Sequence, residues 1–226
     1  MDTLETAGIS VVQAKPKTTG KIFGIGLYKT GTSSLHRALT ILGFRSFHDV
    51  LFYIRERAKN EDTLFPKSIL DHYNAFGDHP FPAHFKEVDQ EYPNSKFILT
   101  VRDIDSWLKS VKQHVKRNRF NPFYRGKFNR YDEAKETSRW HQHTEEVIGY
   151  FKDRSQDLLI MNIIEGDGWE GLCVFLNLPV PPVPFPHWNR NVGVPKHLIN
   201  IFYKWIAGKF KKYIKRQKAK LKFISS

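Results

Sequence analysis

Residues 21–35, KIFGIGLYKTGTSSL, set the organisation of the chain. They begin with a short apolar run that contains two isoleucines and predicts a buried strand over residues 21–27. A glycine-bearing turn follows, and apolar residues then recur three or four positions apart, which predicts a helix over residues 33–42 that ends at Gly43. A strand, a glycine loop and a helix in this order favour a bound phosphate or sulfate group, because loop amides and the helix dipole both attract an anion.

The same alternation recurs further along the chain. Apolar strands are predicted over residues 96–101 and 157–164, and helices over residues 81–92, 103–115 and 168–176. Strands that are continuously apolar, each followed by a helix, predict a parallel sheet covered on both faces. The expected fold class is therefore α/β, a three-layer sandwich with a central, mostly parallel sheet.

The glycine loop differs from that of a nucleoside triphosphatase in one respect. Gly26 and Gly31 have the P-loop spacing, and Ser33 stands in the hydroxyl position. Thr32, however, stands where the lysine that reaches the β- and γ-phosphates belongs, and the lysine comes three residues earlier as Lys29. The predicted strands run into an arginine and a glutamate, not into a metal-binding aspartate. We therefore expect a P-loop-containing nucleotide-binding type of fold whose site holds an anion without a metal.

The run YKTGTSSL resembles the 5′-phosphosulfate loop of the sulfotransferases, which typically reads P-K-[ST]-G-[TS]-[TS]. Tyr28 replaces the proline, as in a branch of small sulfotransferase-like proteins. A second signature of that family is a strand ending in arginine with a serine eight residues later, and Arg102 and Ser110 match it. A third matching piece lies within residues 166–189, so the resemblance covers residues 21–190 in order.

The resemblance implies a sulfotransferase that moves a sulfuryl group from 3′-phosphoadenosine-5′-phosphosulfate (PAPS) to a hydroxyl or amine of a small-molecule or glycan acceptor. Such a metal-independent, in-line transfer depends mostly on positioning and charge stabilisation. Lys29 would stabilise the leaving oxygen, and Arg102 with Ser110 would hold the 3′-phosphate. The residues implied for the 5′-phosphate are Thr30, Gly31, Thr32 and Ser33.

Residues 75–80, AFGDHP, match the turn in which the cytosolic sulfotransferases carry a catalytic histidine shortly before a proline. Alignment on the proline puts Asp78 at the position of the base, with His79 next to it. A histidine with a pKa of ~6.5 is the easier base at neutral pH, whereas an aspartate needs burial to gain basicity. Asp78 is favoured by position and His79 by chemistry, so both are candidates.

The basic excess of the chain lies almost entirely at its C-terminal end. The formal net charge is +13, and the last 56 residues, which contain no acid, carry +11 of it. Global basicity therefore gives no support to nucleic-acid binding, and no specific nucleic-acid partner is expected. Residues 196–226 predict a basic amphipathic helix, which either packs on the core or attaches to an anionic membrane surface.

Three parts are predicted: a polar leader over residues 1–20, the sulfotransferase-like α/β domain over residues 21–195, and the basic C-terminal helix. The leader lacks the apolar core of a signal peptide, and the single cysteine, Cys173, excludes an internal disulfide. We expect a cytoplasmic protein, with peripheral membrane attachment through the tail as the alternative.

Two regions and two histidines stand outside the alternation. Residues 106–131, with eight basic residues and no acid, predict a cationic, loop-like insertion. Residues 177–195, with six prolines, predict an extended strap. His141 and His143 are expected at the surface, not in a metal site, because their spacing puts them on different faces of a helix.

Two other functions remain open. The chain could be a P-loop kinase or NTPase, which the displaced lysine disfavours, or a non-catalytic membrane-peripheral protein on a sulfotransferase-like scaffold.

Overall fold

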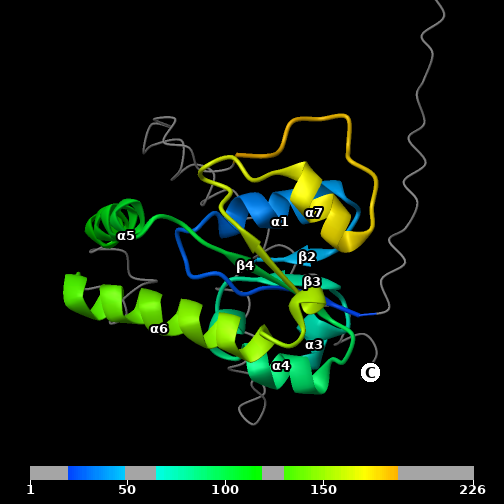
Figure 1. Ribbon diagram of the computed structural model, residues 1–226, viewed down its shortest axis with the longest axis horizontal. Helices are drawn as coiled ribbons and strands as arrows, with labels where there is room; N and C mark the ends of the chain where they lie inside the picture. The colour runs from blue at the N-terminus through cyan, green and yellow to red at the C-terminus, as the bar shows by residue number, and fades with distance from the viewer. Residues whose placement is uncertain (1–19, 49–64, 119–129, 188–226) are drawn as a thin grey trace, which may run out of the picture. The chain divides into compact units, whose positions relative to one another are not determined.

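The computed structural model describes residues 20–48, 65–118 and 130–187. Its centre is a five-stranded sheet in the order β2-β3-β1-β4-β5 (Figure 1), in which every pairing is parallel. The strands are Ile22–Gly24 (β1), Ser46–Phe47 (β2), Ala75–Gly77 (β3), Lys96–Thr100 (β4) and Leu158–Met161 (β5). The predicted α/β fold with a central parallel sheet is confirmed.

Helices cover both faces of the sheet, so the sandwich has the three layers expected (Figure 1). One face carries α1 (Thr32–Ile41) and α7 (Trp169–Leu176), and the other carries α4 (Phe85–Glu91) and α6 (Glu133–Phe151). The other elements are α3 (Lys67–Leu70), α5 (Ile104–Asn118), which packs against α6, and the 3-10 turns η1 (Phe81–Ala83) and η3 (Ser155–Asp157).

Alternate side chains of each central strand enter opposite cores. Phe23 of β1 packs on Phe76 and Phe97 of the neighbouring strands, with ring centroids 5.2 and 5.5 Å apart, and belongs to the core under α4 and α6. Ile22 and Ile98 enter the core under α1 and α7. Burial on both faces explains why these strands are continuously apolar in sequence.

The central position of β1 locates the binding edge of the sheet. Ile22 is in register with Ala75 of β3 on one side and with Lys96 of β4 on the other. After β1 the chain builds β2 and β3 on one side, then crosses back to build β4 and β5. In open parallel sheets ligands bind outside the carboxyl ends of the strands where the order reverses, which here is the edge formed by the ends of β1 and β4.

Two predicted elements differ from the structure. The single helix expected over residues 81–92 is η1 followed by α4, because His84 between them has a non-helical φ of −131°. The helix expected over residues 103–115 is confirmed as α5, which extends to Asn118. The loop-like insertion expected over residues 106–131 is therefore wrong for residues 106–118. Their apolar residues Trp107, Val111 and Val115 recur every four positions and are buried, so the lysines among them lie on the outside of an amphipathic helix.

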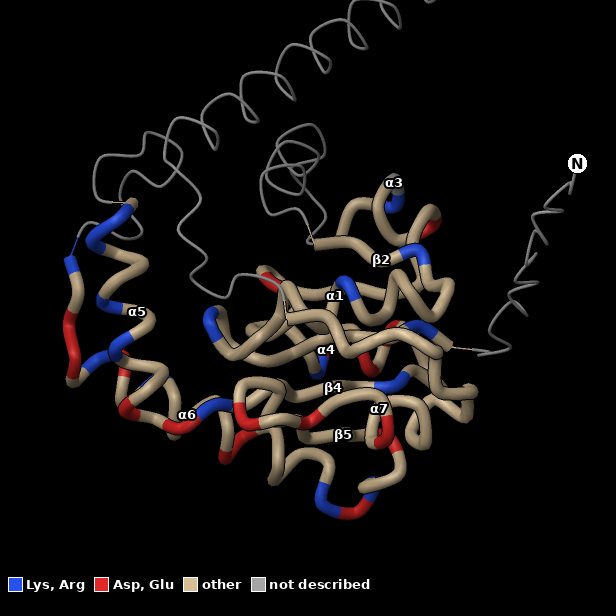
Figure 2. Tube along the Cα trace, turned by 90° about the horizontal axis from the view of Figure 1, so that it is seen from above, with Lys and Arg blue, Asp and Glu red and all other residues tan. Residues whose placement is uncertain are grey.

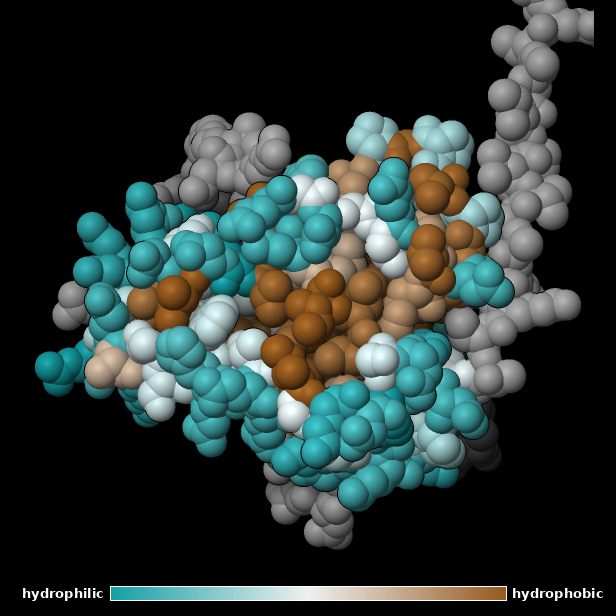
Figure 3. All heavy atoms as spheres, viewed as in Figure 1, coloured by the Kyte–Doolittle hydropathy of each residue, from teal (hydrophilic) through white to brown (hydrophobic). Residues whose placement is uncertain are grey.

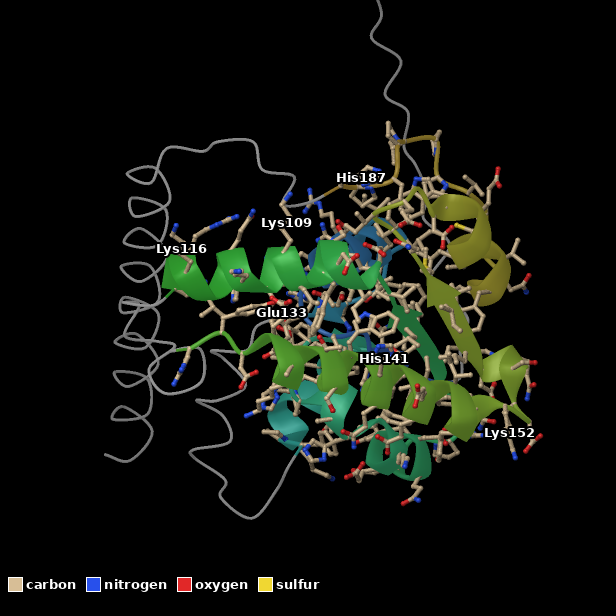
Figure 4. All side chains as sticks on the ribbon, turned by 60° about the vertical axis from the view of Figure 1, so that its left-hand side comes forward. Lys109, Lys116, Glu133, His141, Lys152 and His187 are labelled. Carbon is tan, nitrogen blue, oxygen red and sulfur yellow. The ribbon has the colours of Figure 1, made fainter. Side chains whose placement is uncertain are left out.

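The basic residues of α5 lie mostly on its outer side. Blue segments recur along α5 in Figure 2. Lys109 and Lys116 project from the side of α5 that faces away from α6 (Figure 4). Residues 119–129 of the predicted insertion lie outside the described residues.

The proline-rich strap agrees with prediction over residues 177–187, which contain no helix or strand. Trp169 Nε1 donates a hydrogen bond of 2.7 Å to the Val183 carbonyl, and the Phe185 ring packs on Trp169 at 4.9 Å. The strap is therefore fixed to the start of α7. Its last residues, 188–195, the C-terminal helix expected over residues 196–226 and nearly all of the N-terminal leader lie outside the described residues.

The edge strand β5 has an apolar surface. Ile160 and Ile164 are 44% and 46% exposed. Figure 3 shows an apolar patch in the middle of the face on which β5 lies in Figure 1. No helix in the described part of the chain is both long enough and apolar enough to cross a membrane.

Gly26→Ala is expected to destabilise the protein. A Cβ at Gly26 would overlap the Thr100 hydroxyl and lie 2.5 Å from the Thr100 carbonyl oxygen, so the ends of β1 and β4 would have to separate. We expect the free energy of unfolding to fall by about 1 to 3 kcal/mol, measured by urea denaturation.

Gly149→Ala in α6 is the matched control, because a Cβ there meets nothing within 4 Å. Alanine is the better helix former, so this variant should gain up to about 1 kcal/mol of stability. Equal effects of the two substitutions would contradict the close approach of Gly26 to β4.

Candidate functional site

The loop between β1 and α1 is fixed to the end of β4. Lys29 and Gly31 have left-handed backbone φ angles of 70° and 107°, which turn the chain from β1 into α1. The buried Thr30 hydroxyl donates to the Leu27 carbonyl at 2.6 Å and lies 2.6 Å from the Thr100 hydroxyl. Since Thr30 has used its one proton, Thr100 must donate in the second bond. The loop backbone therefore has little freedom to move.

The residues predicted to bind a 5′-phosphate lie together in this turn. Gly31 is the N-cap of α1, without a side-chain capping bond, and Thr32 is the first helical residue. The Thr30 hydroxyl bonds inward and its backbone N–H donates to the Leu27 carbonyl at 3.3 Å, so both donors of Thr30 are used within the loop. Thr32 is 8% exposed, and Ser33 is half-buried. The amides of the first turn of α1 carry the partial positive charge of a helix N-terminus, which favours an anion here.

Tyr28, which replaces the family's proline, anchors the loop to both α5 and α6. Its hydroxyl donates to Glu136 Oε2 on α6 at 2.9 Å, and Arg139 binds the same carboxylate oxygen at 2.8 Å. Its carbonyl accepts from the buried Trp107 Nε1 of α5 at 2.7 Å. Burial, and then the charge of Glu136, raise the pKa of Tyr28, so the phenol stays a donor. Trp107 is thus a core residue that also holds the loop.

Arg102 follows β4 directly and reaches back to the same loop. Its Nη1 donates to the Lys29 carbonyl at 3.3 Å, and its Nε donates to the Ser106 hydroxyl at 2.8 Å. Asp103 accepts from the Ser106 backbone N–H at 2.9 Å and so caps the start of α5. Ser110, the serine expected beside Arg102, lies one turn beyond Ser106 on the same face of α5. Its contact with a 3′-phosphate stays a prediction.

The charges around Lys29 are mostly of one sign. Burial lowers the pKa of Lys29, and the charges of Arg117 and Arg102 lower it further, while Asp78 opposes them. Burial also lowers the pKa of His114 to about 4. The charges of Lys29 and Arg117 also lower it, and the charge of Asp78 raises it. These residues therefore act on one another electrostatically. An anion bound among them would relieve the repulsion between the cations.

The turn that carries the candidate bases lies at the same edge of the sheet. Asp78 follows β3, the neighbour of β1, and has a left-handed φ of 65°. Its Oδ1 accepts from the His79 backbone N–H at 2.9 Å, and its side chain is 26% exposed. It does not cap η1, whose N-cap is Pro80. The structure therefore places Asp78 close enough to Lys29 for the two charges to interact, with His79 adjacent in the chain.

The prediction for His143 is wrong. His143 is half-buried on α6, and its Nε2 lies 2.7 Å from the Ile25 carbonyl, which can only accept, so Nε2 carries the proton. Burial lowers its pKa. The buried Val147 and Phe151 lie four and eight residues further on, and this spacing could have placed His143 on the inner face. His141 is exposed, as predicted.

Sequence reasoning missed three side chains of α5 near this site: Ser106, His114 and Arg117. Ser106, the predicted Ser110 and His114 recur every four residues, and Arg117 follows three residues later, so all four lie on one stripe. The spacing from Ser110 is the signal that could have found them. Within residues 20–48, 65–118 and 130–187, no group of three or more His, Cys, Asp or Glu side chains is arranged to hold a metal ion.

Comparison with known proteins agrees with this geometry. The family model described as "Sulfotransferase domain" matches residues 21–126 and 116–194. A protein named "Ava biosynthesis cluster protein M" from Aspergillus versicolor is 28% identical, in an alignment that covers 82% of this chain and 87% of the relative.

The burial of His114 and His36 predicts a loss of stability in mild acid. Burial lowers the pKa of each to about 4 from an ordinary value of 6.5. As the pH falls through 6.5 the unfolded chain takes up these protons, and the folded protein does so only near pH 4, so the free energy of unfolding decreases across this window. We expect His114→Gln to flatten this dependence in urea denaturation at a series of pH values.

His141→Gln, which replaces an exposed histidine of α6, is the control and should follow the wild-type curve. If His114→Gln kept the wild-type slope between these pH values, the assignment of His114 as a buried, neutral histidine would be wrong.

Proposed function

The chain belongs to the sulfotransferase-domain family, and from that premise we propose that it transfers a sulfuryl group from PAPS to a hydroxyl or amine of an acceptor. The observation that carries the proposal is the contact between Arg102 and the Lys29 carbonyl, which brings a cation from the end of β4 to the loop that carries Lys29, at the carboxyl edge of the sheet. PAPS carries anionic groups on both the 5′ and the 3′ side of its ribose, so it requires two such sites. The name of the relative, a biosynthesis cluster protein, supports a small-molecule acceptor over a glycan.

The residues of the loop suit the 5′-phosphosulfate end of PAPS. Gly26 and Gly31 let the backbone lie close against Thr100 and Ile163, which leaves the first-turn amides of α1 to receive an anion. The hydroxyls of Thr32 and Ser33 would add to these amides. Arg102, with Ser110 beyond it, would hold the 3′-phosphate, for which a planar guanidinium is well shaped.

Two side chains would perform the chemistry. When bound, PAPS supplies an electrophilic sulfuryl group. The Lys29 ammonium stabilises the negative charge that develops on the oxygen to be released, and its burial strengthens that interaction. Asp78, whose charge interacts with that of Lys29, accepts the proton of the acceptor hydroxyl. His79 is the alternative base.

Adenosine 3′,5′-bisphosphate should stabilise the protein more than ATP does. Binding to the folded state alone raises stability by about 2.7 kcal/mol at a ligand concentration of 100 Kd. We expect a rise in Tm with the bisphosphate that Arg102→Ala removes, because this substitution takes away the grip on the 3′-phosphate.

Lys109→Ala, on the outer side of α5, is the matched control and should keep the full rise in Tm. Equal stabilisation by ATP, together with Mg²⁺-dependent ATP hydrolysis, would show a P-loop kinase or NTPase and overturn the proposal.

Substitutions in the loop and in the β3 turn should separate the catalytic roles. Transfer from ³⁵S-labelled PAPS is measured against a panel of one phenol, one aliphatic alcohol, one amine and one sugar. Lys29→Ala is expected to lose about a hundredfold or more in kcat, because the leaving oxygen loses its cation. Asp78→Asn is expected to lose about 10² to 10⁴-fold, because the base is gone. His79→Asn should stay near the wild-type rate.

A loss in His79→Asn alone would move the base to His79, and full activity in both variants would remove this turn from the mechanism. If no acceptor consumed the donor, the non-catalytic alternative would stand.

A further inference from the structure

A second histidine lies beside Asp78. His48 directly follows β2, the strand that pairs with β3. Its Nε2 is 3.7 Å from Asp78 Oδ2. Its ring also lies over the backbone just before Asp78, because a Cβ built at Gly77 would be 3.5 Å from His48 Cδ2. The parallel pairing of β2 with β3 thus places the imidazole against the carboxylate that the proposed reaction uses.

The nitrogen that faces Asp78 is buried and unsatisfied. Among the residues that the structure describes, His48 Nε2 has no hydrogen-bond partner. Buried polar atoms in folded proteins are nearly always hydrogen-bonded, because an unmade bond leaves the cost of desolvation uncompensated. A separation of 3.7 Å is just beyond hydrogen-bond range, and a shift of about 1 Å closes it. Asp78 Oδ2 is an acceptor placed to satisfy this nitrogen.

The other side of the His48 ring is held by His36. The two rings are stacked with centroids 5.2 Å apart and an interplanar angle of 28°. His36 Nδ1 is 2.8 Å from the Ser46 hydroxyl. Burial, and then the charges of His48 and Arg37, lower the pKa of His36 to about 4, so at neutral pH the His36 ring adds no positive charge beside His48. The packing therefore directs the His48 ring at Asp78.

We propose that His48 is a positioning residue that donates its Nε2–H to Asp78 Oδ2 and fixes the orientation of the carboxylate. The proposal rests on the proposed function, in which Asp78 accepts the acceptor's proton. The His79 backbone N–H already binds Oδ1, so the two donors together hold both oxygens. A carboxylate has about four lone-pair sites, which leaves room for the incoming proton. His48 itself contacts neither the nucleotide nor the acceptor.

The kinetic test compares two replacements of His48 in the full chain. His48→Phe keeps a ring without a donor, and His48→Gln restores an amide N–H. With the fastest acceptor of the panel, we expect His48→Phe to lower kcat about tenfold or more, as for the loss of a hydrogen bond to a charged group. The KM for PAPS and the rise in Tm with adenosine 3′,5′-bisphosphate should not change, and His48→Gln should recover most of the rate.

Ser46→Ala is the matched control, because it removes a hydroxyl from the same cluster without touching Asp78, and it should keep the wild-type kcat. An unchanged kcat in His48→Phe, or equal losses in His48→Phe and His48→Gln, would overturn the positioning role.

A spectroscopic test needs no acceptor. Two-bond ¹H–¹⁵N correlation spectra of the full chain at pH 8 report which ring nitrogen of His48 carries the proton. We expect the Nε2–H tautomer in the wild type and a change in the His48 Nε2 resonance in Asp78→Ala. An Nδ1–H tautomer, or the same Nε2 resonance in both proteins, would overturn the pairing. Absence of sulfuryl transfer would instead overturn the proposed function, and the spectra would still decide whether His48 and Asp78 pair.

Discussion

The candidate site depends on one constraint: the β1–α1 loop is packed against the end of β4 and hydrogen-bonded to it. Thr30 and Thr100 share a buried hydrogen bond of 2.6 Å, and Gly26 approaches the Thr100 backbone so closely that any side chain would overlap it. A buried hydroxyl pair is costly to leave unmade, so the loop is held in one conformation. That conformation brings the Lys29 carbonyl to Arg102 and starts α1 at Thr32. The loop and the end of β4, which carry the two candidate anion sites, are therefore built as one unit.

Few of the 36 basic residues contribute to this unit. Lys29 is half-buried, and Arg102 and Arg117 lie near enough to lower its pKa, with Asp78 as the opposing charge. Cations gathered in this way are costly without an anion, which is the physical reason that the loop should bind one. Other lysines of α5, such as Lys109, point away from α6 and lie on the outer surface of the helix (Figure 4).

The fold and the centre of the site could be read from the sequence, because apolar strands with glycine loops have a local signature. Lys29 and Arg102 were predicted from the glycine-loop pattern and from the resemblance to two sulfotransferase signatures, and the structure places both at the carboxyl edge of the parallel sheet. Helix α5 was predicted over residues 103–115, but residues from 106 onward were also assigned to a loop-like insertion, since the dense lysines obscured the buried stripe of Trp107, Val111 and Val115. The contacts of His143 and His48 depend on long-range packing and strand pairing, which no local pattern encodes.

The central claim is that one edge of the sheet holds the two ends of a 3′-phosphorylated adenine nucleotide. Its most direct test is a crystal structure of the full chain with adenosine 3′,5′-bisphosphate. The account predicts the 5′-phosphate on the amides between Thr30 and Ser33, and the 3′-phosphate within hydrogen-bond distance of Arg102. A nucleotide bound elsewhere, or one whose 3′-phosphate points away from Arg102, would contradict it.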